Sequence, residues 1–425
     1  MFKQSVWIIH QALSIPSVTG GGLHRHYFMA KEFEKLGYQT TLFTGSFHHT
    51  HQSCMLEKNY HIFQDGNTTV SMIKTPTYKK AKSIRRIWNW IVFMLRLFFI
   101  PIQKIPRPDI IIVSSLSLLP ILNGLYFKWR FGCKIILEIR DIWPLTLVEV
   151  GGYNRRHPLV FILSWIEKIG YKHYDYLSSN LPFAYKHFQH ILGHRPFKFK
   201  WISNGIEVKP YTGIESVIEG FNEHLKGTHF NVGYAGKLGV SNAMEDFIEA
   251  VKILKNHPNI RFYVAGNGDL LNVFKDKVKN CDNIIFLGKI PREQVQFFLS
   301  KMDLAYIGWQ NIPIYRYGIS ANKIFDYMLS GKPILMSGKI PGNEIEKSNC
   351  GWVIEAGGSH KIAECIEKIS TLPKKELLVK GKNGQRKVIK KYTYEILAAK
   401  YVDIFNELLE PSIEKRSINP SLLVD

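Results

Sequence analysis

The hydrophobic positions of the chain alternate between two patterns. Short runs rich in β-branched residues predict strands, and longer stretches with apolar positions three or four residues apart predict helices. The expected strands cover residues 6–9, 40–43, 110–113, 134–138, 176–179, 231–234, 262–265, 284–286, 304–307 and 334–336. The expected helices cover residues 23–36, 243–256, 270–278, 292–301, 321–329 and 394–409.

Strand–helix alternation of this kind indicates parallel sheets with helices on both faces, which is an α/β fold. A chain of 425 residues is too long for one ordinary core. We therefore expect two Rossmann-like domains, at residues 1–197 and 198–390, followed by a C-terminal helix at 391–412 and a polar tail at 413–425. Ligands of such sheets bind outside the carboxyl ends of the strands, which predicts a central cleft between the facing domains.

The cysteines and the N-terminus indicate a protein of the cytoplasm. The five cysteines, Cys54, Cys133, Cys281, Cys350 and Cys365, are scattered singly and form no CxxC pair. This usage is typical of a reducing compartment and predicts neither a disulfide framework nor a structural zinc. The first apolar run is far too short for a signal peptide, so we expect no export.

The formal charge of +21 is unevenly distributed. Residues 1–200 hold 26 Lys and Arg against 10 Asp and Glu, a net charge of +16. Anionic lipid and nucleic acid are both candidate partners for such a surface. Aromatic residues do not interleave with Lys and Arg in a stacking motif, however, and no known nucleic-acid-binding motif is present. We expect no nucleic-acid partner.

Two segments of the first half carry candidate functional residues. Gly20, Gly21 and Gly22 precede an expected helix and let backbone N–H groups approach an anion, although a mobile surface turn gives the same pattern. His24 and Arg25 follow at once and favour the anion site. Arg140 and Asp141 come directly after a strand, where Asp141 can position or deprotonate a hydroxyl, or form a simple surface pair with Arg140.

The second half repeats the strand-then-glycine arrangement at Gly236-Lys237 and at Gly266. A lysine is a compact cation suited to a diphosphate oxygen, although many such lysines are only solvated.

A longer block follows at residues 317–334. Ser320 is expected to cap a helix with free N–H groups that face a phosphate, and Asn322 lies in its first turn. Lys323 and Asp326 share one helical face. The lysine offers a cation for a diphosphate, and the aspartate offers a carboxylate for a ribose diol. Ordinary α/β packing also explains this block.

Taken together, these segments resemble the family 4 retaining glycosyltransferases of GT-B fold. The block Ser320-Ala321-Asn322-Lys323-Ile324-Phe325-Asp326-Tyr327-Met328 with Gly331-Lys332-Pro333 resembles the family's nucleotide-binding helix. Gly236-Lys237-Leu238, Gly266-Asn267-Gly268, Ile290-Pro291 and Ser203-Asn204-Gly205-Ile206 resemble further family motifs in order. Gly22-Leu23-His24-Arg25-His26-Tyr27 and Arg140-Asp141-Ile142-Trp143-Pro144 resemble the subgroup of fucosamine-type transferases of O-antigen and capsule assembly.

The resemblance implies sugar transfer from a nucleotide diphosphate donor, expected to be a UDP-N-acetyl-aminosugar, to a polyprenyl-diphosphate-linked saccharide in surface polysaccharide biosynthesis. No cofactor and no metal are implied. The implied catalytic residues are Asp141, Lys237 and Lys323. The implied donor-binding residues are Gly21, Gly22, Arg25, Gly236, Gly266, Ile290, Ser320, Asn322 and Asp326. His24 and Arg140 are implied on the acceptor side.

The sequence departs from the family pattern at three positions. The usual pair of glutamates maps to Gly318 and Asp326, a second lysine after Lys237 is missing, and Arg140 stands where many members carry a histidine. A UDP-N-acetylhexosamine 2-epimerase of the same fold is the alternative reaction.

The segment 79–107 predicts where the protein works. Five basic residues, Lys79, Lys80, Lys82, Arg85 and Arg86, precede an apolar stretch at 87–102 that contains Asn89 and Arg96. Because the stretch is short and carries a charge, it predicts an interfacial helix rather than a membrane span. Its aromatic residues Trp88, Trp90, Phe93, Phe98 and Phe99 are expected to enter an anionic membrane surface. The localisation implied is cytoplasmic, at the inner face of the plasma membrane; a buried core helix is the alternative.

Overall fold

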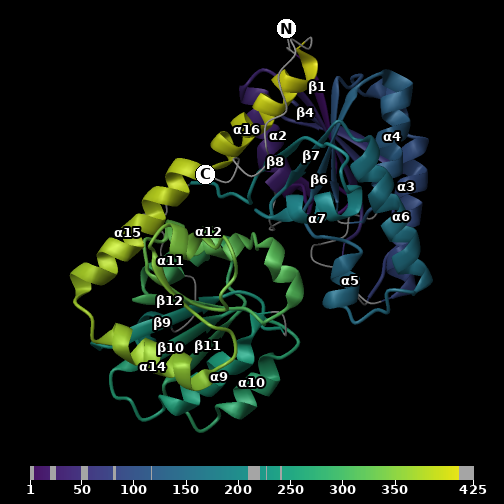
Figure 1. The fold of residues 1–425 in the computed structure, drawn as a ribbon. Helices are drawn as coiled ribbons and strands as arrows, with labels where there is room; N and C mark the ends of the chain where they lie inside the picture. Colours follow the sequence, from purple (N-terminus) through teal and green to yellow (C-terminus); the bar gives the residue numbers. More distant parts are fainter. Residues whose placement is uncertain are drawn as a thin grey trace. The chain divides into compact units, whose positions relative to one another are not determined.

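The computed structural model describes residues 4–19, 25–48, 56–79, 83–115, 117–208, 221–225, 227–239 and 242–410. The chain forms two compact units (Figure 1). Unit 1 combines Met1–Ser203 with Tyr394–Asp425, and unit 2 is Asn204–Thr393. The change of unit therefore lies a few residues beyond the expected boundary, and the last helix returns to unit 1.

Unit 1 contains an eight-stranded sheet in the order β3-β4-β2-β1-β5-β6-β7-β8. Every neighbouring pair is parallel except β3 and β4. The strands are β1 Ser5–Ile9, β2 Gln39–Gly45, β3 Tyr60–Asp65, β4 Thr68–Ile73, β5 Ile110–Ser115, β6 Lys134–Ile139, β7 Tyr176–Ser179 and β8 Phe199–Trp201.

Helices cover both faces of this sheet. α3, α4 and α6 form one layer, while α2 and α16 pack together on the other (Figure 1). The unit 1 helices are α1 Pro16–Thr19, α2 Arg25–Lys35, α3 Ile84–Phe98, η1 Ile102–Lys104, α4 Pro120–Phe131, α5 Leu145–Glu149, α6 Pro158–His173, α7 Ala184–Leu192 and α16 Tyr394–Leu409.

Unit 2 contains a parallel six-stranded sheet in the order β11-β10-β9-β12-β13-β14. Its strands are β9 Phe230–Ala235, β10 Ile260–Ala265, β11 Ile284–Gly288, β12 Leu304–Gly308, β13 Ile334–Ser337 and β14 Gly351–Ile354. Its helices are α8 Phe221–His224, α9 Met244–Ile253, α10 Leu271–Lys277, η3 Arg292–Gln294, α11 Val295–Ser300, η4 Pro313–Tyr317, α12 Asn322–Leu329, α13 Glu344–Lys347, α14 Ser359–Ser370 and α15 Lys374–Lys391.

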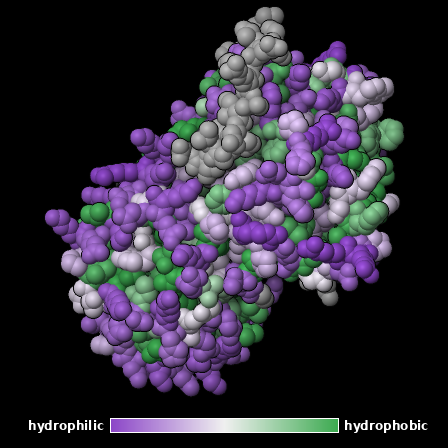
Figure 2. Space-filling model, viewed as in Figure 1, coloured by the Kyte–Doolittle hydropathy of each residue, from purple (hydrophilic) through white to green (hydrophobic). Residues whose placement is uncertain are grey.

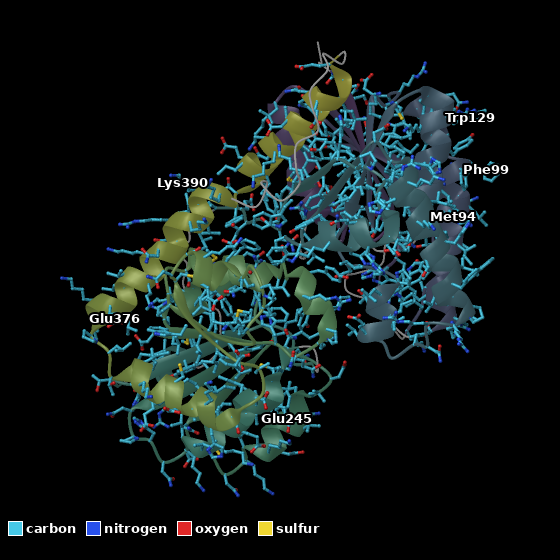
Figure 3. All side chains as sticks on the ribbon, in the orientation of Figure 1. Met94, Phe99, Trp129, Glu245, Glu376 and Lys390 are labelled. Atoms are coloured by element: carbon cyan, nitrogen blue, oxygen red, sulfur yellow. The ribbon has the colours of Figure 1, made fainter. Side chains whose placement is uncertain are left out.

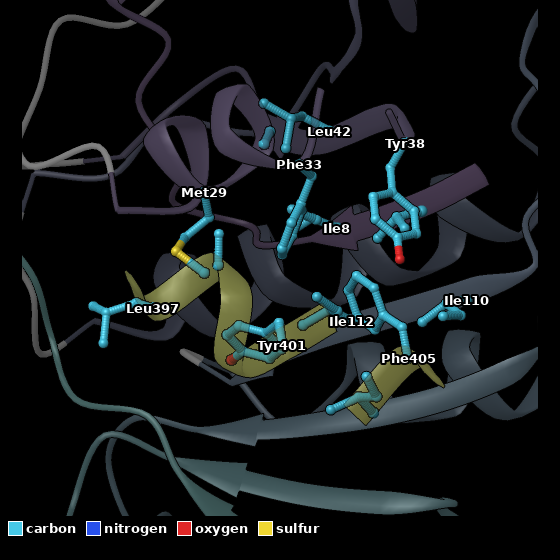
Figure 4. Close-up of a cluster of buried hydrophobic side chains, with 14 of the residues drawn as sticks. Ile8, Met29, Phe33, Tyr38, Leu42, Ile110, Ile112, Leu397, Tyr401 and Phe405 are labelled. Carbon is cyan, nitrogen blue, oxygen red and sulfur yellow. The ribbon is translucent and has the colours of Figure 1, made fainter. Parts of the chain in front are cut away.

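A cluster of buried side chains ties α16 to unit 1 (Figure 4). Phe405 of α16 packs against Phe33 of α2 with tilted rings, at a ring-centroid distance of 5.2 Å. Tyr401 and Leu397 are also buried there, beside Ile112 of β5. Because burying a large apolar side chain contributes about 1.5–3 kcal/mol, the end of the chain stabilises the first unit strongly.

α3 is a helix as expected, but two of the aromatic residues expected to enter a membrane surface are buried. Trp90 and Phe93 pack in the core at 5% and 0% exposure, so neither reaches a lipid surface. Trp88 and Phe99 instead point outward, at 54% and 78% exposure. Spacing of about 3.6 residues per turn sends these two pairs to opposite sides of the helix. None of the helices in the described part of the chain is both long and apolar enough to cross a bilayer.

Candidate active site

The N-terminus of α12 is the centre of the candidate site in unit 2. The expected cap at Ser320 is wrong: the residue before the helix is Ala321, and no side chain caps the first turn. The Ser320 hydroxyl instead accepts a hydrogen bond from the backbone N–H of Asn204 at 2.9 Å. The first N–H groups of α12, beginning at Asn322, therefore lack a side-chain acceptor within the described residues, and such groups suit an anion.

Lys323 lies in this first turn and is largely enclosed. Its ammonium donates to Asn242 Oδ1 and, at 3.4 Å, to the Tyr234 hydroxyl. It also lies 5.0 Å and 5.3 Å from the ring centroids of Tyr234 and Trp309. Among the described residues no carboxylate pairs with it, and burial lowers the pKa of Lys323 to about 7. A buried cation without an anionic partner is a ready site for a bound anion.

Two glycines bring the backbone close to this lysine. Gly236 ends β9, and a side chain there would lie 3.6 Å from Lys323 Nζ. Gly266 ends β10, where a side chain would collide with the carbonyl oxygen of Gly236 at 1.8 Å. Lys237 follows and is exposed, with a loose pair to Asp269 at 3.9 Å. The structure therefore brings Gly236, Gly266 and Lys323 together at the carboxyl edge of the sheet.

The carboxylate of Asp326 forms an ion pair with Arg292. Both of its carboxylate oxygens accept hydrogen bonds from Arg292, one of them at 2.7 Å. The Asp326 side chain is 6% exposed, whereas that of Arg292 is 41% exposed. Arg292 belongs to the loop that begins with Ile290 after β11, so this bidentate pair fixes that loop beside α12. The sequence reasoning missed Arg292 because nothing in the spacing of the two residues pairs them.

A buried charged cluster lies in unit 1 around Glu138 of β6. Its carboxylate accepts hydrogen bonds from Arg25 at 2.9 Å, His26 at 2.5 Å, Ser114 at 2.6 Å and Tyr401 at 2.7 Å. Burial alone would raise the pKa of Glu138, but His26 and Arg25 hold that pKa well below its usual range.

Arg25 is placed in this core instead of at a donor-facing surface. Its guanidinium also donates to the carbonyl oxygens of Ile202 and Ser203, and only 3% of the residue is exposed. With these donors directed into the protein, Arg25 holds β6 against the end of β8.

Arg140 and His10 form the outer part of the cluster. Arg140 donates to His10 Nε2 at 3.0 Å, and its backbone N–H donates to the Ser115 hydroxyl. Since arginine has no acceptor, His10 Nε2 must accept and the His10 proton resides on Nδ1. Burial, with the charges of His26 and Arg140, holds the pKa of His10 well below its ordinary value, so the ring is neutral. Asp141 follows at the same edge and is exposed.

Gly21, Gly22 and His24 lie outside the described residues.

Comparisons with known proteins place the chain among glycosyltransferases. Residues 229–371 match the family model described as Glycosyl transferases group 1. The probable glycosyltransferase WbjE of Pseudomonas aeruginosa is 20% identical over 300 residues, which are 69% of this chain and 72% of WbjE. The capsular polysaccharide biosynthesis glycosyltransferase CapM of Staphylococcus aureus is 22% identical over 215 residues, 49% of this chain and 54% of CapM. Anabaena HepE, solved with UDP and glucose, has a TM-score of 0.64 at 13% identity, over 95% of this chain and 100% of HepE.

The family match lies within unit 2 and contains β9, α12 and the lysines and glycines at their ends. The similarity to solved structures extends over nearly the whole chain and confirms the expected fold class, two Rossmann-like units with C-terminal helices. The protein is therefore a glycosyltransferase with a GT-B fold, and its residues 229–371 are similar to group 1 glycosyltransferases.

Proposed function

We propose that the protein transfers a sugar, with retention of configuration, from a UDP-N-acetyl-aminosugar to a lipid-linked saccharide in O-antigen or capsule biosynthesis. The observation that carries this proposal is Lys323, a partly buried cation without a carboxylate partner among the described residues, in the uncapped first turn of α12. A nucleotide diphosphate supplies the negative charge that this position lacks.

The chemistry requires fixed positive charge beside the leaving group. As the bond between the anomeric carbon and the diphosphate breaks, negative charge accumulates on the phosphate oxygens. Lys323, Lys237 and the N–H groups of α12 are the donors proposed to stabilise it, so no bound metal is needed. Gly236 and Gly266 allow the diphosphate to approach the backbone, and the loop at Ile290 would hold the base.

Unit 1 is proposed to bind the acceptor. The acceptor hydroxyl forms the new bond to the anomeric carbon, and its proton passes to Asp141 or to the departing diphosphate. Arg140, held by His10, would orient an anionic group of the acceptor. Asp326 is proposed to contact the ribose, which requires its bond to Arg292 to be shared or broken.

Two relatives support the choice of substrates. HepE was solved with UDP, and CapM is named for capsular polysaccharide biosynthesis. A polyprenyl-diphosphate-linked acceptor is confined to a membrane, so the proposed place of work is the inner face of the plasma membrane. The group 1 match favours transfer over 2-epimerisation.

A thermal-shift panel of UDP-, GDP- and dTDP-sugars tests the donor. A ligand that binds only the folded state at 100 times its Kd stabilises by about 2.7 kcal/mol, so the correct donor should raise Tm clearly. Asp141→Asn should keep this shift and lose transfer to a polyprenyl-diphosphate saccharide, with product configuration read by NMR. No Tm shift with any nucleotide sugar, or an unchanged shift in Lys323→Met, would overturn the donor assignment.

A further inference from the structure

Three helices of unit 1 expose large apolar side chains on one layer. α3 presents Ile84, Trp88, Leu95 and Phe99, α4 presents Trp129, and α6 presents Phe161, Ile162 and Trp165, at exposures from 44% to 82%. Figure 3 shows Phe99 and Trp129 projecting outward from neighbouring helices. We call these eight residues the outer apolar face.

The outer apolar face is continuous from α3 to α4. Phe98 of α3 contacts Tyr126 of α4 at a ring-centroid distance of 5.2 Å, and Tyr126 contacts Trp129 at 6.1 Å. α6 packs against α4, where Gly170 allows close contact with Ile121. Hydrophobic residues interrupt the polar surface along this edge of the unit (Figure 2).

α6 makes the need for a partner clearest. Its inward side buries Val160, Leu163 and Ile166, while Phe161 and Trp165 stand 73% and 60% exposed on the other side. Large apolar side chains exposed together on a helix mark a surface that contacts a partner or a membrane. One side of α6 packs against the protein, and we therefore expect the apolar side chains on the other side to contact a second apolar environment.

The charged residues around the outer apolar face indicate which apolar environment it contacts. The sequences of α3 and α4 contain no Asp or Glu, and the one carboxylate of α6, Glu167, is buried and bonded to His187 and Tyr171. The same helices carry seven Lys and Arg: Arg85, Arg86, Arg96, Lys128, Arg130, Lys168 and Lys172. Of these, Lys128 is paired with Asp175 at 2.6 Å. Exposed aromatic side chains bordered mainly by cations match a bilayer with anionic headgroups.

We propose that the outer apolar face of α3, α4 and α6 docks on an anionic bilayer, with Trp129, Phe161 and Trp165 entering the headgroup boundary. The docking face extends the proposed function and rests on it, because the face serves sugar transfer only if the acceptor is held in a membrane. It also moves the contact from α3 alone to a three-helix surface. The aromatic residues supply the apolar attraction, and the exposed cations Arg130, Lys168 and Lys172 supply the electrostatic attraction.

Flotation with lipid vesicles tests the proposal on the full chain. Wild-type protein should float with vesicles of equal parts phosphatidylcholine and phosphatidylglycerol, less with phosphatidylcholine alone, and less at high salt. The triple variant Trp129→Ser, Phe161→Ser, Trp165→Ser should bind at least tenfold more weakly. The matched control Val273→Ser, Leu378→Ser, Val379→Ser removes exposed apolar residues from unit 2 and should float as wild type does.

A second pair of measurements separates this proposal from the reaction. The triple variant should keep its thermal shift with the nucleotide donor and its transfer to a soluble, short-chain acceptor, while losing transfer to acceptor embedded in vesicles. Equal flotation of triple variant and wild type would overturn the docking face. So would a wild-type dimer in solution that the triple variant converts to monomer, since the face would then be a protein interface. If the wild-type protein did not bind the nucleotide donor, the proposed function would be overturned, but the docking face would not.

Discussion

At the scale of single residues, Lys323 is the most informative side chain of unit 2. Ion-paired lysines keep their charge easily, whereas Lys323 is surrounded by the Asn242 amide, the Tyr234 phenol and the Trp309 indole. Burial lowers its pKa to about 7, so its charge in the free protein changes near neutral pH. A bound diphosphate would favour the protonated form and raise that pKa again.

This linkage predicts that donor affinity depends on pH. A diphosphate esterified to a sugar has no proton to lose near neutrality, so Lys323 is the titrating group. Below about pH 7 the Lys323 ammonium is already charged, so the affinity for the donor should be constant. Above about pH 7 Lys323 must take up a proton when the donor binds, so each unit of pH should weaken binding by up to about tenfold. Calorimetry with a UDP-sugar across this range measures the slope. Lys323→Met should bind weakly with no such slope, while Lys237→Met should keep it; a pH-independent wild type contradicts the assignment.

The same scale shows what the sequence could and could not predict. Gly236, Gly266 and Lys323 follow strands or begin a helix, so topology alone placed them at one edge of the sheet. Asn242 and Arg292 were missed, because their contacts with Lys323 and Asp326 of α12 join segments that are far apart in sequence. Arg25 was misplaced for the opposite reason: a charged residue beside a glycine run suggests a ligand, but Glu138 draws it into the core.

At the scale of elements, every expected strand is present, and β3 and β4, two of the four strands that the pattern did not predict, were missed for the same reason. β4 has the sequence TTVSMI and β3 has YHIFQD, so neither contains the aliphatic run that marks the other strands of unit 1. They form an antiparallel hairpin around Gly66, whose φ is 63°. The Gly66-Asn67 pair between the two strands was the available signal, because glycine at the first central position favours a tight two-residue hairpin turn.

α16 was expected as a helix, but its partner was not predictable, because helical periodicity does not say which unit the helix covers. The structure shows that Tyr401 of α16 donates a hydrogen bond to the buried Glu138 at 2.7 Å. The last helix therefore completes a cluster whose other members come from α2, β5 and β6.

Tyr401→Phe should lower the free energy of unfolding by about 1–2 kcal/mol, because a hydrogen bond to a charged group is lost while Arg25, His26 and Ser114 still hold Glu138. Urea denaturation followed by circular dichroism measures the change. Tyr38→Phe is the matched control, since Tyr38 lies in the same apolar cluster and its hydroxyl makes no hydrogen bond within the described residues. Equal effects of the two substitutions would show that the bond to Glu138 contributes nothing.

At the scale of the whole molecule, the chain is divided unequally in both charge and connectivity. The basic excess lies in the first half of the sequence, which supplies most of unit 1. Unit 2 is one continuous segment, whereas unit 1 is completed only by residues from 394 onward. The two units should therefore differ in their ability to fold alone.

The last prediction follows from this connectivity. A fragment of residues 204–393 holds its entire sheet and the Lys323 site, so it should fold cooperatively and bind a UDP-sugar. A fragment of residues 1–203 lacks α16, whose buried side chains include Tyr394, Leu397, Tyr401, Ile404 and Phe405. Burial of five such residues contributes on the order of 10 kcal/mol, which is comparable to the stability of a whole domain. Circular dichroism, thermal melts and calorimetry on each fragment should find the second one unfolded or aggregated, and a peptide of residues 394–410 should restore its melting transition. A cooperative melt of 1–203 without the peptide would show that α16 is dispensable to unit 1.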